Sequence, residues 1–264
     1  MAKMAEVAAR VSILGSGSGG NCAVISSTAT SIMIDAGFSR RETLRRLAAL
    51  GESPERIAAL LVSHEHNDHV AGLPVLARSL PCPVFVNEGT RAALGAAAAP
   101  LPRVEAFAAG RPFAIGDIEV SPISVPHDAA DPVAFTFRVE GVKIGLITDL
   151  GYIPENVREA VRGCACLVFE SNHDLDMLKA GPYPWPLKQR VLSRVGHLSN
   201  DCLAAFLSEG FDGAAAHLVL AHLSQNNNLP ELARLTAEQA LGGGCHRPQL
   251  HVASQDVPLP SIVL

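Results

Sequence analysis

The chain has 264 residues, a length that allows one large hydrophobic core, so we expect a single domain over residues 1–264. Hydrophobic residues make up 48% of the sequence, which is typical of a folded globular protein and argues against extended disorder. The net charge of -5 argues against a protein that grips nucleic acid over a long basic surface. No apolar stretch reaches the roughly 18 residues that a membrane-spanning helix needs, so we expect no membrane partner.

The sequence also bears on the cellular compartment. Residues 1–7 carry charge but no apolar core of the signal-peptide type. The six cysteines are scattered without a repeating pattern, and in such a chain we expect thiols rather than disulfides. Together these features predict a cytoplasmic protein.

In the first half of the chain, short apolar runs alternate with turns. A glycine-serine loop, Gly15–Asn21, joins the first two of these runs. The capping box Ser39-Arg-Arg-Glu42 starts an amphipathic helix that Gly51 ends. We expect strands at residues 11–15, 22–26, 31–35, 57–63 and 84–87, a short helix after residue 69, and an alanine-rich helix that ends at Pro100.

The second half contains a run of strands followed by alternating strands and helices. We expect strands at residues 118–125, 133–140, 142–148, 167–170, 214–221 and 249–253, with helices after Asn200 and from Pro230. Residues 181–186, with three prolines and the chain's one tryptophan, predict an ordered functional loop. Because each half has strands followed by helices, we expect two sheets packed face to face with helices outside.

Residues 64–69 read His-Glu-His-Asn-Asp-His and carry the strongest functional signal. They offer the imidazoles of His64, His66 and His69 and the carboxylate of Asp68. Imidazole binds Zn, Mn, Fe, Ni and Cu, and carboxylate suits the harder divalent ions. The stretch follows the expected strand at 57–63, and the end of a rigid strand holds ligands in place. It therefore predicts half of a metal site, with a solvated polar loop as the alternative.

Other strand ends offer the missing ligands. His127, Asp149 and His222 each follow an expected strand, and His197 lies just before an expected helix. A carboxylate at the end of a buried strand is costly unless it is paired or bound to metal. A single histidine at such a place is more often a surface or core residue. Their joint occurrence after several strands, however, predicts one shared site.

The pattern His64-x-His66-x-Asp68-His69, followed by a strand-end His, Asp and His, resembles the metallo-β-lactamase fold. Several longer words resemble the YycJ/WalJ branch of that family: Gly15–Cys22, Ile34–Gly37, Glu170–Asp174, Gly196–Asn200 and His222–Asn227. The resemblance implies an α/β fold, a four-layer αββα sandwich of two mixed β-sheets. It also implies a link to DNA metabolism, with exonuclease activity in some members.

The resemblance further implies a centre of two divalent metal ions, Zn or Mn, with Fe as an alternative. His64, His66 and His127 would hold one ion and Asp68, His69 and His222 the other, with Asp149 bridging the two. Such a pair of ions, about 3.5–4 Å apart, lowers the pKa of a shared water and stabilises phosphoryl oxygens.

Two residues are assigned catalytic roles by the same resemblance. Asp68 would orient the nucleophile, and His197 would donate a proton to the leaving oxygen. The alternative for His197 is a residue that binds backbone at the start of a helix. For His173, which lies in one of the longer words, we expect a role beside the ligands or with substrate.

Three functions follow from these residues. The first is a phosphodiesterase acting on DNA, for which Trp185 and the basic residues at 179, 188, 190 and 194 would form a lip over the site, or else an ordinary solvated helix face. The second is a small-molecule hydrolase: a cyclic phosphodiesterase, thioesterase or lactonase. The third is a binding protein with a vestigial site, against which the full ligand set argues. The short spacings from His127 to Asp149 and from Asp149 to His222 leave no room for the tRNA-gripping arm or the β-CASP domain of more elaborate nucleases.

Overall fold

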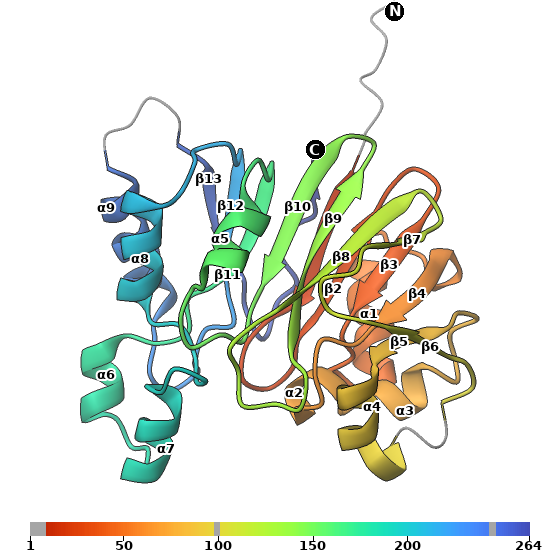
Figure 1. Ribbon diagram of the computed structural model, residues 1–264, viewed down its shortest axis with the longest axis horizontal. Helices are drawn as coiled ribbons and strands as arrows, with labels where there is room; N and C mark the ends of the chain where they lie inside the picture. Colours follow the sequence, from red (N-terminus) through yellow and green to blue (C-terminus); the bar gives the residue numbers. More distant parts are fainter. Residues whose placement is uncertain (1–8, 98–100, 243–246) are drawn as a thin grey trace, which may run out of the picture.

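The computed structural model describes residues 9–97, 101–242 and 247–264, and these form two seven-stranded sheets (Figure 1). The first sheet has the order β14 (Ile262–Val263), β1 (Arg10–Gly15), β2 (Cys22–Ser26), β3 (Ser31–Ile34), β4 (Ile57–Leu61), β5 (Val84–Asn87) and β6 (Val104–Phe107). The second has the order β13 (Gln249–Val252), β12 (His217–Ala221), β11 (Cys166–Glu170), β10 (Val142–Ile147), β9 (Val133–Val139), β8 (Ile118–Ser124) and β7 (Phe113–Ile115). Both sheets are mixed, because each is parallel from one middle strand outward and antiparallel on the other side.

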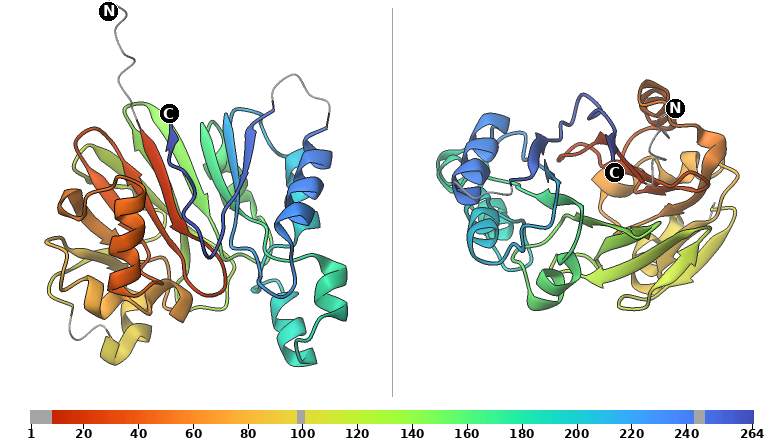
Figure 2. Two further views of the ribbon diagram at one scale, coloured as in Figure 1. Left: turned by 180° about the vertical axis from the view of Figure 1, so that it is seen from behind. Right: turned by 90° about the horizontal axis from the view of Figure 1, so that it is seen from above.

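Helices cover the outer faces of both sheets, as Figure 2 shows from above. Between the strands of the first sheet, the chain forms α1 (Arg40–Ala49), the 3-10 turn η1 (Pro54–Arg56), α2 (Asn67–Val70), α3 (Leu73–Leu76), α4 (Glu88–Leu94) and the 3-10 turn η2 (Gly95–Ala97). The second half contains α5 (Glu155–Val161), α6 (Leu175–Ala180), α7 (Trp185–Val191), α8 (Asn200–Glu209) and α9 (Pro230–Leu241).

Alternation along the strands produces the four layers. In β1, Ile13 packs in the cluster between the sheets, whereas Leu14 packs outward in the cluster under the helices. In β11, Val168 and Phe169 divide in the same way between the two faces. Successive side chains on a strand point to opposite faces, and these strands are apolar on both faces. Each sheet is therefore covered by the other sheet on its inner face and by helices on its outer face. The predicted αββα sandwich of two mixed sheets is confirmed.

Some expected boundaries differ from the structure. The expected loop at 181–186 is wrong at its end, because α7 begins at Trp185, and a proline in the first turn of a helix costs no hydrogen bond. The expected alanine-rich helix ends at Leu94, and its expected end at Pro100 lies outside the described residues. The described cysteines are free thiols, as predicted, and Cys245 lies outside the described part of the chain.

Two segments that carry site residues cross at very close range. Asn21 donates its backbone N–H to the carbonyl oxygen of Asp68 at 2.7 Å, and Gly37 donates to the carbonyl of Asn21 at 3.0 Å. A Cβ atom on Gly37 would lie 1.9 Å from the carbonyl oxygen of Asp68. Position 37 therefore requires glycine, and this contact fixes the position of the loop that holds the histidine cluster.

We expect Gly37→Ala to lower the free energy of unfolding by about 3 kcal/mol, because the added methyl group displaces backbone. For a chain of this size, the melting temperature would fall by about 6–12 °C in thermal denaturation. Gly51→Ala is the control: nothing lies within 4 Å of its added Cβ, and only its positive φ of 71° opposes the change. Equal losses in both variants would contradict the crowding argument.

Candidate metal centre

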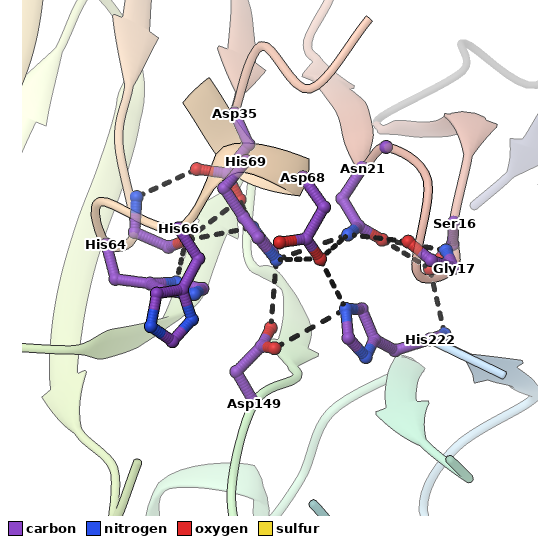
Figure 3. Close-up of polar contacts among 12 residues, drawn as sticks. Ser16, Gly17, Asn21, Asp35, His64, His66, Asp68, His69, Asp149 and His222 are labelled. Atoms are coloured by element: carbon purple, nitrogen blue, oxygen red, sulfur yellow. Dashed lines mark hydrogen bonds and ion pairs between the residues drawn. The ribbon is translucent and has the colours of Figure 1, made fainter. Parts of the chain in front are cut away.

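The seven expected ligands meet at one edge of the two sheets, where several strands end (Figure 3). Asp35 and His222 directly follow β3 and β12, Asp149 lies two residues after β10, and all three have left-handed backbone with φ of 60°, 56° and 62°, respectively for Asp35, His222 and Asp149. Such a conformation costs a non-glycine residue of order 1–3 kcal/mol and persists where the surroundings enforce it. Backbone strain is therefore concentrated at this site.

The first group consists of His64, His66 and His127. Its ring nitrogens lie within 4.8 Å of one another, and the Nδ1 of His66 is 3.2 Å from the Nε2 of His127. The Nδ1 of His127 is 3.0 Å from the carbonyl oxygen of Gly196 and donates to it, which leaves Nε2 as the free lone pair in the group. Three imidazoles therefore present nitrogen to one point.

The second group consists of Asp68, His69 and His222. The Oδ2 of Asp68 lies 3.4 Å from the Nε2 of His69 and 3.2 Å from the Nε2 of His222. Asp149 lies between the groups: its oxygens are 3.4 Å from both of these nitrogens, and its Oδ1 is 3.9 Å from the Nε2 of His127. Figure 3 shows Asp149 facing the second group from the opposite side to Asp68.

Two further carboxylates orient these histidines from behind. Asp35 accepts from the Nδ1 of His69 at 2.8 Å, and Glu170 lies 3.2 Å from the Nδ1 of His222. Glu170 also lies 2.7 Å from the Nδ1 of His197. In each histidine, a proton held on Nδ1 by a carboxylate leaves Nε2 free to bind an ion or to face substrate.

Asp35 and Glu170 were not among the expected site residues. Both occur in the words Ile34–Gly37 and Glu170–Asp174 that carried the family resemblance, and both are buried at the end of a strand. The signal that selected Asp149, a carboxylate ending a buried strand, applied equally to these two.

Burial and opposite charge compete at this site. Burial alone would raise the pKa of Asp149, but the surrounding histidines, His222 first and then His69, hold it well below the usual range. Burial alone would lower the pKa of His69, yet Asp149, Asp35 and Asp68 outweigh burial and raise it. The pKa of His222 is raised in the same way. The buried carboxylates thus need positive charge beside them, which a divalent cation also supplies.

The donor set fits a divalent cation in a second respect. Among the described residues, the Nε2 of His64 and the Oδ2 of Asp149 are buried atoms without a hydrogen-bond partner. Such atoms are costly unless something else binds them. All seven expected ligands therefore lie close together, and their binding of metal stays a prediction.

A cavity of about 320 Å³ opens beside the two groups. His66, Asp68, Asp149, His197 and His222 line it from one side. The side chain of His197 is 21% exposed, so its Nε2 is accessible from the cavity while Glu170 holds its Nδ1. His197 also forms, with Asp149, Glu170 and His222, a group whose ligand atoms all lie within 4.8 Å of one another, so its expected role as a proton donor stays a prediction.

The glycine-serine loop contacts the site through Asn21. The Nδ2 of Asn21 donates to the Oδ2 of Asp68 at 3.1 Å, while its Oδ1 accepts from the backbone of Gly17 at 2.9 Å. The hydroxyl of Ser16 accepts from the backbone N–H of His222 at 2.8 Å. The loop therefore braces two residues of the second group, Asp68 and His222, and Ser18 lines the cavity.

His173 lies behind this site. Its side chain is buried, its Nδ1 contacts the Oδ1 of Asn172 at 3.3 Å, and its Nε2 has no hydrogen-bond partner among the described residues. Burial lowers its pKa to about 4, although Glu170 opposes the shift. The structure places it beside the ligand loops rather than in contact with the cavity.

This depressed pKa predicts a pH dependence of stability. The folded-state pKa of His173 lies below its unfolded value, so the associated stability is complete above about pH 6.5 and is lost as the pH falls toward 4. We expect His173→Gln to remove about 3 kcal/mol of this acid sensitivity at pH 4. Urea unfolding with chelator, at several pH values, measures the difference between the two proteins. Parallel curves for the wild type and the variant would contradict it.

Comparison with known proteins agrees with this geometry. Residues 30–223, more than half of the chain, match the Beta-lactamase superfamily domain, and the chain belongs to that superfamily. It is 39% identical over 232 residues to the exodeoxyribonuclease YycJ of Bacillus anthracis, covering 87% of this chain and 88% of the relative. It is 35% identical over 238 residues to the exodeoxyribonuclease WalJ of Streptococcus pneumoniae serotype 2, covering 88% of each chain. The predicted YycJ/WalJ branch is confirmed.

A solved structure extends the comparison. The metallo-β-lactamase fold protein YhfI from Bacillus subtilis matches with a TM-score of 0.73 and 16% identity, covering 95% of this chain and 99% of that one. At this identity the likeness shows the fold alone. In the part of the chain that the structure describes, no helix has the length and apolar character to cross a membrane.

Proposed function

We propose that the chain is a metal-dependent phosphodiesterase that acts as an exodeoxyribonuclease. The observation that carries this proposal is the arrangement of two ligand groups, joined by Asp149, around a cavity that His197 also faces. The names of the relatives at 35–39% identity support DNA as the substrate. We propose Zn or Mn as the ions, with Fe as the third candidate, because the site offers nitrogen and oxygen ligands.

In this proposal, His64, His66 and His127 hold one ion, and Asp68, His69 and His222 hold the second, with Asp149 shared. When bound, two such ions lower the pKa of a water and stabilise charge on the phosphoryl oxygens. The chain then has to position the attacking water, protonate the leaving oxygen and admit the right part of the substrate.

Specific side chains meet these requirements. Asp68 is partly exposed to the cavity and fixed by Asn21, so its carboxylate orients the attacking water. His197, in the form protonated on both ring nitrogens, donates its Nε2 proton to the leaving 3′- or 5′-oxygen, while Glu170 accepts from its Nδ1 and holds the ring. A cavity of about 320 Å³ is at the small end of ligand sites and accepts a terminal nucleotide rather than a paired stem. This size supports attack at an end of the strand.

The test is hydrolysis by the purified protein after loading with Mn²⁺ or Zn²⁺. Single- and double-stranded DNA labelled at either end would be compared with bis-p-nitrophenyl phosphate and a thioester. We expect mononucleotide release from a DNA end, loss of activity with chelator, and recovery on adding metal. Turnover of the thioester alone would instead indicate a small-molecule hydrolase.

Asp68→Ala provides the control for contaminating nucleases. We expect it to lower hydrolysis of both DNA and the nitrophenyl ester by at least about three orders of magnitude, because it removes a ligand and the group that orients the water. If the variant degrades DNA as fast as the wild type does, the activity belongs to another protein and the proposal fails.

A further inference from the structure

Helices α6 and α7 project beyond the sheets on the side that carries the site (Figures 1 and 2). Tyr183, Leu187, Arg190 and Val191 line the cavity opposite the metal ligands. One face of α7 is therefore a wall of the cavity, and the outer surface of the same short segment continues away from it.

This wall is fixed to the ligand loops rather than free. The backbone N–H of Asp174 donates to the carbonyl of Asn227 at 2.9 Å, and the side chain of Asn226 contacts the Oη of Tyr183 at 3.4 Å. The ammonium group of Lys188 on α7 donates a hydrogen bond to the carbonyl oxygen of Lys179 on α6 at 2.6 Å, and Lys188 is largely buried. Lys188 therefore braces the helices, and it does not contribute to a basic outer surface.

The outer surface of the segment is aromatic and apolar. Trp185 is 63% exposed, and the adjoining residues Pro182, Pro184 and Pro186 are exposed as well. Leu192, which directly follows α7 and lies seven residues after Trp185, is 41% exposed. Trp185 itself does not line the cavity, but Tyr183 and Leu187, two residues to either side, do. A tryptophan that leaves most of its surface in water beside such residues indicates a binding surface rather than core packing.

Two arginines, Arg190 on α7 and Arg194 just after it, accompany this surface. Arg190 lies on the cavity side and forms an ion pair with Asp128, which also lines the cavity. Arg194 is exposed and lies over the ring of Tyr152, 4.2 Å from its centroid. Exposed aromatic rings beside arginines are the usual means of binding unpaired strands, because bases stack on the rings while cations contact phosphates.

We propose that α7 and the residues just before it form a stacking platform for an unpaired DNA strand. Tyr183 contacts the part of the strand that enters the cavity, Trp185 stacks on a base further out, and Arg190 contacts a phosphate between them. Bases in a duplex are already stacked and paired, so the platform selects a single-stranded end. This inference rests on the proposed function, because it assigns the strand that the metal site cleaves.

The chain allows a direct measurement of binding, because Trp185 is its one tryptophan. Intrinsic fluorescence would be recorded in chelator, so that no cleavage occurs, while a short oligothymidylate is added. We expect saturable quenching with the oligothymidylate and at least tenfold weaker binding of a blunt duplex of equal length. A signal that does not change, or that changes equally with the duplex, overturns the platform.

Kinetics on the metal-loaded enzyme give the second measurement. We expect Trp185→Ala to raise KM for single-stranded DNA about tenfold while kcat changes less than twofold. Trp185→Phe should recover most of the affinity because it keeps a ring. Leu235→Ala, which shortens an apolar residue that is 50% exposed on α9, is the matched control and should leave KM unchanged.

The outcomes separate this inference from the proposed function. If the wild type hydrolyses DNA but Trp185→Ala has the KM of the wild type, the platform is wrong and the phosphodiesterase stands. If the wild type hydrolyses neither DNA nor bis-p-nitrophenyl phosphate with any metal, the proposed function is wrong. Quenching by anionic lipid vesicles or by an unrelated peptide, but not by the oligothymidylate, would assign the surface to another partner and overturn the inference.

Discussion

Asp149→Asn is expected to abolish metal retention and to lower hydrolysis by at least about three orders of magnitude. Asp149 lies between the two ligand groups, and its carboxylate is buried among histidines that hold its pKa well below the usual range. Asparagine keeps the size of the side chain and tolerates the left-handed backbone found at this position, with φ of 62°. The change therefore removes one negative charge with little disturbance of the backbone.

Metal analysis after dialysis, together with initial rates on DNA, measures the effect. Asp176→Asn is the control, because it also removes one carboxylate charge, but Asp176 is exposed on α6, pairs with Lys179 and belongs to no ligand group. That variant should retain the metal content of the wild type. Full metal content in Asp149→Asn would show that Asp149 does not bridge the ions.

The sequence predicted the layers of the fold because the strands are strongly apolar. Strands such as β4 and β11 are buried almost throughout, and a short apolar run between turns predicts a strand without knowledge of its neighbours. Of the four edge strands, β13 was predicted, whereas β6, β7 and β14 were missed because they are short and their apolar pattern is weak. In β6 and β7 the exposed residues Glu105 and Ala114 interrupt the apolar pattern, and each strand is only a few residues long.

The seven expected ligands lie close together in the structure, and their roles stay a prediction. Ligands placed after strands leave a local signal, because Asp149 and His222 come within two residues of the ends of β10 and β12. The roles of Glu170 and Asn21 depend on contacts with residues far away in the chain, His222 and Asp68, so no spacing rule specifies them. The expected loop at 181–186 overlaps the start of α7, because Pro186 is common in loops and is equally suited to the first turn of a helix.

Glu170→Gln is expected to produce the second large effect, because one buried carboxylate serves two histidines. Its contact with His222 orients a ligand, and the loss of such a contact lowers metal affinity about 10- to 100-fold. Its contact with His197, at 2.7 Å, orients the proton donor. Burial raises the pKa of Glu170, but His197 and then His222 outweigh it and hold the pKa at about 2, so the group is ionised throughout the working range. Glutamine removes that charge and keeps the shape.

The two contacts are separated by the choice of substrate and by a double-mutant cycle at saturating metal. Departure of p-nitrophenolate needs no proton, whereas departure of a DNA hydroxyl does, so a defect in proton donation lowers kcat on DNA far more than on bis-p-nitrophenyl phosphate. We expect Glu170→Gln and His197→Ala each to lower kcat on DNA by about 10²- to 10³-fold, and the double variant to be no slower than His197→Ala alone. Additive losses in the double variant would mean that Glu170 acts on catalysis independently of His197. Equal losses on both substrates in Glu170→Gln would mean that Glu170 acts through His222 and the metal. Equal losses on both substrates in His197→Ala would remove His197 from the role of proton donor.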